Sequence, residues 1–223
     1  YALQAFMNES GIDAEVIDYR NSKIEEQYKP VRMKFHNIKE LAYDVLTINE
    51  RRIRRKKFDQ FIDQYYRVSD CMYDRESIEK SCKIYDELWT GSDQVWDLRL
   101  SGGDLTYLLD FCREDKKYSY AASIGKSVLD HDEAEIFSGH LESYRAISVR
   151  EETGRALLRK LVDKDIRVVL DPVFLLTKEQ WRKIAVYPRI TEDYIFVYKI
   201  ADSRAFDYAL RLSIEEKCKA VVL

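Results

Sequence analysis

The chain has 223 residues, of which 46% are hydrophobic and 35% are charged, and its formal net charge is -3. This length allows one large domain, or one domain and part of another, with a well-solvated surface. A mildly acidic chain has no overall attraction to nucleic acid, and no apolar run reaches the roughly 20 residues of a membrane-spanning helix. We therefore expect a soluble globular protein without a nucleic-acid partner.

The first third of the chain predicts a helix, a strand, a loop and a long helical stretch. Residues 1–9 are helical in character and end before Gly11, and residues 14–19 have the composition of a strand. Residues 20–29 are polar and predict a surface loop. Apolar residues then recur at helical spacing over residues 37–65, which predicts two helices or one bent helix.

Six of the seven residues from Arg51 to Lys57 are basic. Such a segment invites a nucleic-acid or membrane interpretation, but one basic helical turn inside an acidic chain is more often a solvated face. Peripheral contact with an anionic membrane or a lipid-linked glycan stays open as the alternative.

The middle of the chain alternates predicted strands with predicted helices. Strands are expected at residues 83–90, 105–111, 117–122, 145–149 and 166–170, with a short helical turn at 76–80 and helices at 133–143 and 151–162. This alternation predicts an α/β fold with a parallel, Rossmann-like sheet and helical crossovers.

A second α/β unit begins near the carboxyl end. Thr177 caps a predicted helix that runs to Ile184, and a linker follows. A strand over 194–200, a helix over 203–217 and a strand over 219–223 come next. We place the first domain at residues 1–190 and the start of an incomplete second domain at residues 191–223, with both ends of the chain expected to be cut.

Three of the predicted strands run directly into polar loops, at residues 90, 122 and 149. These loops carry Ser92, Asp93, Ser123, Gly125 and Arg150. The carboxyl ends of parallel strands share one edge of a sheet, and open α/β sheets bind ligands at that edge. We therefore expect these side chains to line one cleft.

The loop after residue 90 offers sugar-binding and acid-base chemistry. Ser92 and Asp93 can hydrogen-bond sugar hydroxyls, and Asp93 can act as a general base, although a helix-capping role fits equally well. Trp96 could stack on a sugar face, but a buried aromatic side chain is the favoured interpretation. Asp171, which precedes Pro172, is favoured as a turn former over a site residue.

Ser123 and Gly125 belong to a segment that ends like a phosphate loop. The nucleotide-binding pattern requires glycine at position 120, where the chain has Tyr120, so a nucleotide P-loop is excluded. The Ser123 hydroxyl and the backbone at Gly125 could still bind the donor or the sugar, and a tight turn is an equal alternative.

Arg150 directly follows a predicted strand. Its planar guanidinium can pair bidentately with a carboxylate or a phosphate, in a way that a lysine cannot. The alternative is a surface ion pair with Glu151 or Glu152, and loop position alone does not separate the two.

Four segments, in this order and spacing, resemble the polysaccharide pyruvyl transferase family. They are Gly-Ser-Asp-Gln-Val-Trp (91–96), Ser-Tyr-Ala-Ala-Ser-Ile-Gly (119–125), Ile-Ser-Val-Arg-Glu (147–151) and Asp-Pro-Val-Phe-Leu-Leu (171–176), and residues 1–6 resemble the end of the family's amino-terminal motif. Arg150 matches the arginine of the Ser-Val-Arg motif, which favours donor binding. The resemblance implies a two-domain, glycosyltransferase-B-like architecture, here with a truncated second domain.

The resemblance also implies the reaction. Family members transfer the pyruvyl group of phosphoenolpyruvate to two hydroxyls of a sugar as a ketal, so we expect phosphoenolpyruvate as co-substrate, no cofactor, and a glycan or lipid-linked saccharide acceptor in envelope or exopolysaccharide biosynthesis of the bacterial type. Two alternatives stay open: a glycosyltransferase that uses a nucleotide sugar, and a non-catalytic module that binds glycans or anions.

The general acid of the family is thought to be a histidine in an Arg-x-His segment, which this sequence lacks. His36, His131 and His140 match no such motif, and we expect each to be a surface or packing residue. The catalytic histidine is therefore expected outside this chain, which would leave the chain incomplete for catalysis.

The four cysteines predict neither a zinc site nor a disulfide. Cys71, Cys82, Cys112 and Cys218 form no Cys-x-x-Cys pair, and only three histidines could complete a metal site. We therefore expect reduced thiols, no bound metal and a cytoplasmic protein, peripheral to the membrane at most.

Overall fold

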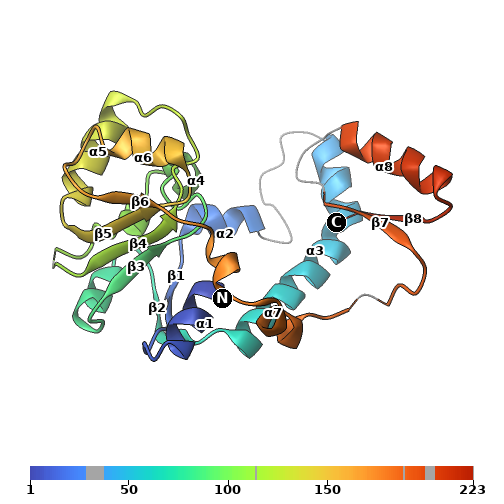
Figure 1. Ribbon diagram of the computed structural model, residues 1–223, viewed down its shortest axis with the longest axis horizontal. Helices are drawn as coiled ribbons and strands as arrows, with labels where there is room; N and C mark the ends of the chain where they lie inside the picture. Colours follow the sequence, from blue (N-terminus) through green and yellow to red (C-terminus); the bar gives the residue numbers. More distant parts are fainter. Residues whose placement is uncertain (29–37, 114, 188, 199–203, 223) are drawn as a thin grey trace. The chain divides into compact units, whose positions relative to one another are not determined.

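The computed structural model describes residues 1–28, 38–113, 115–187, 189–198 and 204–222. Its contacts divide the chain into two compact units, Tyr1–Thr177 and Lys178–Leu223 (Figure 1). Contacts define a compact unit, whereas a domain is defined by independent folding. The domain boundary near residue 190 therefore stays a prediction.

The first unit contains a four-stranded parallel sheet in the order β3-β4-β5-β6. Its strands are β3 (Leu88–Gly91), β4 (Lys117–Ala122), β5 (Tyr144–Val149) and β6 (Ile166–Val168). The crossover from β4 to β5 contains α5 (His131–Leu141), and the next contains α6 (Glu152–Leu158), as Figure 1 shows. The predicted parallel α/β sheet with helical crossovers is confirmed.

The core of this unit lies against one face of the sheet. Trp96 is 1% exposed and packs edge-on against Phe137 of α5 and Tyr144 of β5, with ring centroids 6.1 Å apart in both pairs. Its indole nitrogen donates a hydrogen bond to the carbonyl of Tyr107 at 3.0 Å. A buried indole needs such an acceptor, so the packing role favoured for Trp96 is confirmed.

A second, two-stranded parallel sheet pairs β1 (Val16–Tyr19) with β2 (Val68–Tyr73). The remaining helices of its part of the chain are α1 (Ala2–Glu9), α2 (Ser22–Tyr28) and α3 (Ile38–Tyr65). The long helical stretch is thus one helix, and β2 had no counterpart in the sequence prediction.

The surface loop predicted at residues 20–29 is wrong, because α2 lies there. Asn21 precedes this helix, and its side-chain oxygen accepts a hydrogen bond from the Ile24 backbone at 2.9 Å, which satisfies one of the free donors of the first turn. The polar composition of this segment reflects a short helix on which Ser22, Lys23 and Glu26 are exposed.

The strand predicted at residues 105–111 is also wrong. After α4 (Leu98–Ser101) the chain forms the short 3-10 helix η2 (Thr106–Leu108). The Asp104 carboxylate accepts hydrogen bonds from both the backbone and the hydroxyl of Thr106, and Leu109 has a φ of 51°. A left-handed residue cannot continue a strand, so local capping overrides the apolar pattern.

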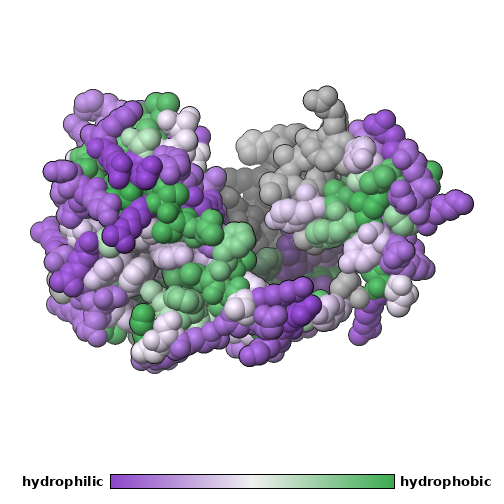
Figure 2. Space-filling view, in the orientation of Figure 1, coloured by the Kyte–Doolittle hydropathy of each residue, from purple (hydrophilic) through white to green (hydrophobic). Residues whose placement is uncertain are grey.

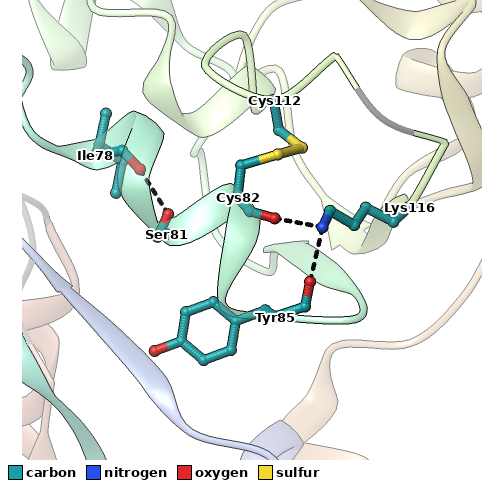
Figure 3. Close-up of a disulfide and its surroundings, with 6 residues drawn as sticks. All are labelled: Ile78, Ser81, Cys82, Tyr85, Cys112 and Lys116. Carbon is teal, nitrogen blue, oxygen red and sulfur yellow. Dashed lines mark hydrogen bonds between the residues drawn. A yellow bond between two sulfur atoms is a disulfide. The ribbon is translucent and has the colours of Figure 1, made fainter.

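The prediction of no disulfide is wrong, because Cys82 is bonded to Cys112. Figure 3 shows that the bond joins η1 (Ile78–Lys83) to the segment after η2, beside the Lys116 ammonium, which contacts the Cys82 and Tyr85 carbonyls. The two Cα atoms are 5.4 Å apart although the residues are separated by 30 positions. Spacing along the sequence did not reveal this pair.

The first unit ends with η3 (Pro172–Leu175), which follows β6. Figure 2 shows hydrophobic surface over this part of the unit, where Leu170, Val173 and Phe174 are exposed. The second unit contains α7 (Lys178–Ile184), β7 (Tyr194–Val197), α8 (Arg204–Glu215) and β8 (Lys219–Val222). Strands β7 and β8 pair in parallel, so the strand–helix–strand pattern predicted at this end is confirmed, and its assignment to a second domain stays a prediction.

Candidate functional site

The carboxyl edge of the four-stranded sheet gathers the loops that the sequence singled out. Ser123 donates its backbone N–H to the Asp93 carbonyl at 2.9 Å, and the Arg150 backbone N–H donates to the Ala122 carbonyl at 3.2 Å. Because the strands are parallel, the loops after β3, β4 and β5 leave the sheet at the same edge. The prediction that these loops share one edge is confirmed, and the expectation that their side chains line one cleft stays a prediction.

A bulge at the end of β4 sets the direction of the second loop. Ala121 is fully buried with a φ of 51°, and the register with β5 shifts between Ser119 and Ala122. Ser148 repairs the interrupted ladder, since its hydroxyl accepts from the Ala121 N–H at 3.1 Å and donates to the Ser119 carbonyl at 2.8 Å. Bulges of this kind re-aim the residues that follow them, here Ser123.

Asp171, at the end of the β6 segment, is the centre of the cluster. One of its oxygens accepts from the Ser92 hydroxyl at 2.7 Å and from an Arg150 Nη at 3.2 Å. Its other oxygen accepts the Val173 N–H at 3.0 Å and so caps η3. The sequence interpretation favoured only a turn for Asp171, and the structure shows that it both caps the turn and joins three loops.

These contacts also set the protonation of Asp171. Partial burial acts to raise the pKa of its carboxyl group, but hydrogen bonds from Val173, Ser92 and Arg150 outweigh burial and hold the pKa below its ordinary value of 3.8. Asp171 is therefore a carboxylate at neutral pH, and in this form it accepts the hydrogen bond from the Arg150 guanidinium.

Arg150 lies among three carboxylates. Besides Asp171, its guanidinium nitrogens lie 3.7 Å from a Glu151 oxygen and 3.9 Å from an Asp93 oxygen. The side chain is 31% exposed, so it is oriented by its neighbours and remains open to a ligand. One cation among three carboxylates cannot by itself attract a multiply charged anion, and such a ligand would need further cations from outside this cluster.

The two sides of the cluster differ in exposure. The Ser123 hydroxyl is buried, donates to Glu151 and accepts from the Gly125 N–H at 3.2 Å, so it organises the turn. Gly125 is exposed with a φ of 68°, a conformation that suits glycine. The Asp93 side chain is 89% exposed, and its carboxylate is open to accept a proton or a hydroxyl hydrogen bond.

Neither described histidine joins this cluster in the part of the chain that the structure covers. His131 is exposed at the start of α5, with its Nδ1 near Asp132 and Glu135. His140 lies near the end of α5, and partial burial lowers its pKa. His36 lies outside the described residues, and the location of the general acid beyond this chain stays a prediction.

Two further features of the described residues concern metals and membranes. No group of three or more His, Cys, Asp or Glu side chains is arranged to hold a metal ion. None of the helices is long and apolar enough to cross a membrane.

Comparison with known proteins identifies the family. No curated protein and no solved structure shows significant similarity to the chain. The family model described as polysaccharide pyruvyl transferase matches residues 1–217, which is nearly the whole chain, and this protein therefore belongs to the polysaccharide pyruvyl transferase family.

Proposed function

We propose that this protein transfers the pyruvyl group of phosphoenolpyruvate to two hydroxyls of a saccharide in the synthesis of an envelope or exported polysaccharide. The family match over residues 1–217 carries this proposal, since it is a family of transferases that act on polysaccharides. The residues gathered at the carboxyl edge of the four-stranded sheet, here called the edge cluster, support it with groups suited to the chemistry; they are Ser92, Asp93, Ser123, Gly125, Arg150, Glu151 and Asp171.

The reaction requires three proton movements and one leaving group. The methylene carbon of the donor gains a proton, and the adjacent carbon is attacked by one acceptor hydroxyl, which loses its proton to a base. A second hydroxyl of the same sugar then displaces phosphate and also gives up its proton. The product is a ketal with free phosphate, so the reaction needs no oxidant and no cofactor.

We assign the roles from the geometry of the cluster. Arg150 binds the carboxylate or phosphate of the donor, and Asp171 holds its guanidinium in place at 3.2 Å. Asp93 accepts the proton of an attacking hydroxyl, because its carboxylate is the exposed one. Ser92 and the backbone at Gly125 position the sugar or the donor, whereas Ser123 orders the turn beneath them.

The excess of carboxylates in the cluster supports a divided site. Asp93, Glu151 and Asp171 outnumber Arg150, so the remaining charge of the donor must be met by cations elsewhere in the full-length enzyme. A second domain in a glycosyltransferase-B-like arrangement would supply them, together with the histidine that protonates the methylene carbon.

Calorimetric titration of the full-length enzyme with phosphoenolpyruvate tests the role of Arg150. Arg150→Ala should cost roughly 2 to 4 kcal/mol of donor binding because a charge-assisted pair is lost. Arg150→Lys should also weaken binding, since a lysine cannot form the bidentate pair. The stability of either variant should change by less than about 1 kcal/mol, because the ion pairs of Arg150 are partly exposed.

Arg167→Ala is the matched control, because Arg167 lies on the neighbouring strand β6 and is exposed with an ion pair to Asp165 at 2.9 Å. It should leave donor affinity unchanged. Unchanged affinity in Arg150→Ala would remove Arg150 from the donor site. If a nucleotide sugar bound in place of phosphoenolpyruvate, a glycosyltransferase would be the better assignment.

We propose a cytoplasmic location with peripheral membrane contact. The disulfide removes the argument from reduced cysteines, and the location rests instead on the donor, because a multiply charged phosphate ester does not cross a bilayer unaided. The exposed basic segment from Arg51 to Lys57 on α3 supports contact with anionic lipid. Cell fractionation tests both points. Recovery of the protein on the far side of the cytoplasmic membrane would contradict the location, and recovery in the soluble cytoplasmic fraction alone would contradict the membrane contact.

A further inference from the structure

A polar cavity lies at the carboxyl ends of β1 and β2, apart from the edge cluster. Its volume is about 580 Å³, within the usual range of small-molecule sites. Its wall is formed by the residues that follow β1 and β2 and by residues 101–105. None of the residues assigned above to donor binding or base catalysis lines it.

Asn21 fixes the floor of this cavity. Its side-chain amide donates to the Ser101 carbonyl at 3.0 Å and to an Asp104 oxygen at 2.7 Å, and it is 7% exposed. Tyr19 donates to the same Asp104 oxygen. The other Asp104 oxygen accepts two hydrogen bonds from Thr106, one from its backbone N–H and one from its hydroxyl. Because the loops are cross-linked in this way, the cavity is formed before a ligand arrives.

The cations that line the cavity are engaged by the protein. Arg20 donates a hydrogen bond from an Nη to Asp18 at 2.9 Å, and Arg75 donates two hydrogen bonds to Asp110. Lys23 donates to a backbone carbonyl at 3.1 Å. Lys23 keeps its charge, but Asp74, Glu76 and Asp104 also line the cavity. Among the described residues of the lining, the carboxylates therefore outnumber the one cation that no carboxylate neutralises, and an acidic ligand has little to gain there.

The remaining lining suits an uncharged, hydroxyl-rich ligand. Ser22 and Glu76 are exposed and can donate to or accept from hydroxyls, and Gly103 has a φ of 83° with no atom within 4 Å of an added Cβ. A ligand can therefore approach the chain closely at Gly103, although its N–H already donates to the Leu98 carbonyl at 2.8 Å. The ring of Tyr19 is held edge-on against Tyr107 and adds an apolar surface of the kind that sugar faces contact.

We infer that this cavity binds an uncharged sugar unit of the acceptor polysaccharide. This inference rests on the proposed function, because it is the acceptor of that reaction which the cavity would hold. One segment of the chain links the edge cluster to the cavity. It follows β3, begins with Ser92 and Asp93, and reaches the cavity wall at residues 101–105. The connection that carries the proposed base would therefore also hold the sugar, through its residues 101–105.

Saturation-transfer NMR on the full-length protein tests this inference with a defined set of probes. The probes are the methyl glycosides of glucose, galactose, mannose and N-acetylglucosamine, and methyl glucuronide is the charged comparison. We expect saturation of at least one neutral glycoside and a signal at least tenfold weaker for the glucuronide.

Two variants and one control locate the binding. Ser22→Trp fills the cavity, and Glu76→Ala removes an acceptor from its exposed rim; each should lower the affinity for the bound glycoside at least tenfold. Glu79→Ala changes an exposed glutamate on the neighbouring η1 that does not line the cavity, and it should bind as the unchanged protein does. A signal that survives in either cavity variant, or no neutral glycoside bound at all, overturns the inference, as does stronger binding of the glucuronide.

The outcome can be separated from that of the proposed function. Ser22→Trp and Glu76→Ala should leave the calorimetric affinity for phosphoenolpyruvate unchanged, and Arg150→Ala should leave glycoside binding unchanged. Donor binding without glycoside binding would defeat the cavity assignment alone. Glycoside binding without donor binding would defeat the pyruvyl transfer alone.

Discussion

Removal of the disulfide should destabilise the first unit strongly. The bond between Cys82 and Cys112 closes a segment that contains β3, the loop with Ser92 and Asp93, and the part of the polar cavity's wall at residues 101–105. Cys82 is 6% exposed and Cys112 is fully buried. The double change Cys82→Ala and Cys112→Ala leaves two small apolar side chains in place. Its main effect is therefore to raise the conformational entropy of the unfolded chain.

The magnitude follows from the length of the closed segment. The two cysteines are separated by 30 positions, and the chain-entropy relation for such a loop gives about 3.6 kcal/mol at 25 °C. A chain of this size changes its melting temperature by roughly 2 to 4 °C per kcal/mol. The double variant should therefore melt on the order of 7 to 14 °C below the oxidised protein.

Urea unfolding followed by tryptophan fluorescence measures this effect, because Trp96 is buried in the core of the affected unit. The unfolded double variant is less constrained, so its denaturant slope should be steeper. Reductant should lower the stability of the unchanged protein by a similar amount and leave the double variant unaffected. A variant with Cys71→Ser and Cys218→Ser, which replaces the two free cysteines, is the control and should keep its stability.

Equal unfolding curves for the oxidised protein, the reduced protein and the double variant would refute this reasoning. A cost below about 1 kcal/mol would mean that the unfolded chain keeps these segments together without the bond, since the entropic effect requires a freely disordered loop.

Two further predictions concern acid stability and glycine. Burial acts to raise the pKa of Asp104, but hydrogen bonds from neighbouring side chains hold it below 3.8, so its contribution to stability is present above that pH and is lost as the pH falls further. Urea unfolding between about pH 5 and pH 2 should show a flatter decline for Asp104→Asn, and an identical slope would contradict this assignment. Gly91→Ala should destabilise by more than about 2 kcal/mol, because its φ is 145° and an added Cβ would lie 2.0 Å from the Tyr120 carbonyl oxygen. Gly139→Ala, in the open helical part of α5, should stabilise by up to about 1 kcal/mol, and thermal melts that rank these two variants the other way would refute the argument.

The parallel sheet was predictable because each of its strands and crossover helices is encoded by neighbouring residues in the sequence. Residues 117–122 and 145–149 are short, rich in strand-forming residues, and separated by a clearly periodic helical stretch. Parallel strands joined by helices must end at one edge, so the shared position of Ser123 and Arg150 followed from the pattern alone. The prediction failed where capping acted instead, as at Asp104 and Asn21, whose side chains start helical turns in segments that looked like strand or loop.

The disulfide and the polar cavity depend on distances between residues far apart in the sequence. Cys82 lies on the short 3-10 helix η1 and Cys112 on the segment after η2, and their Cα atoms come to 5.4 Å although 30 positions separate them. The floor of the cavity likewise depends on a contact between Asn21 and Asp104, which are 83 positions apart in the sequence. Residue type restricts such pairings, but it does not identify them.

Arg150 shows most clearly what residue type leaves open. The sequence presented its donor-binding role and its surface ion pair as alternatives, yet Glu151 and Asp171 both lie within 4 Å of the guanidinium. An arginine held by carboxylates keeps its planar fork in one orientation, and it stays exposed enough to meet a ligand. The same carboxylates lower the local potential, so an anionic donor gains affinity only when further cations complete the site. The orientation of Arg150 thus belongs to this unit, while the charge that attracts the proposed donor would have to come from cations outside this cluster.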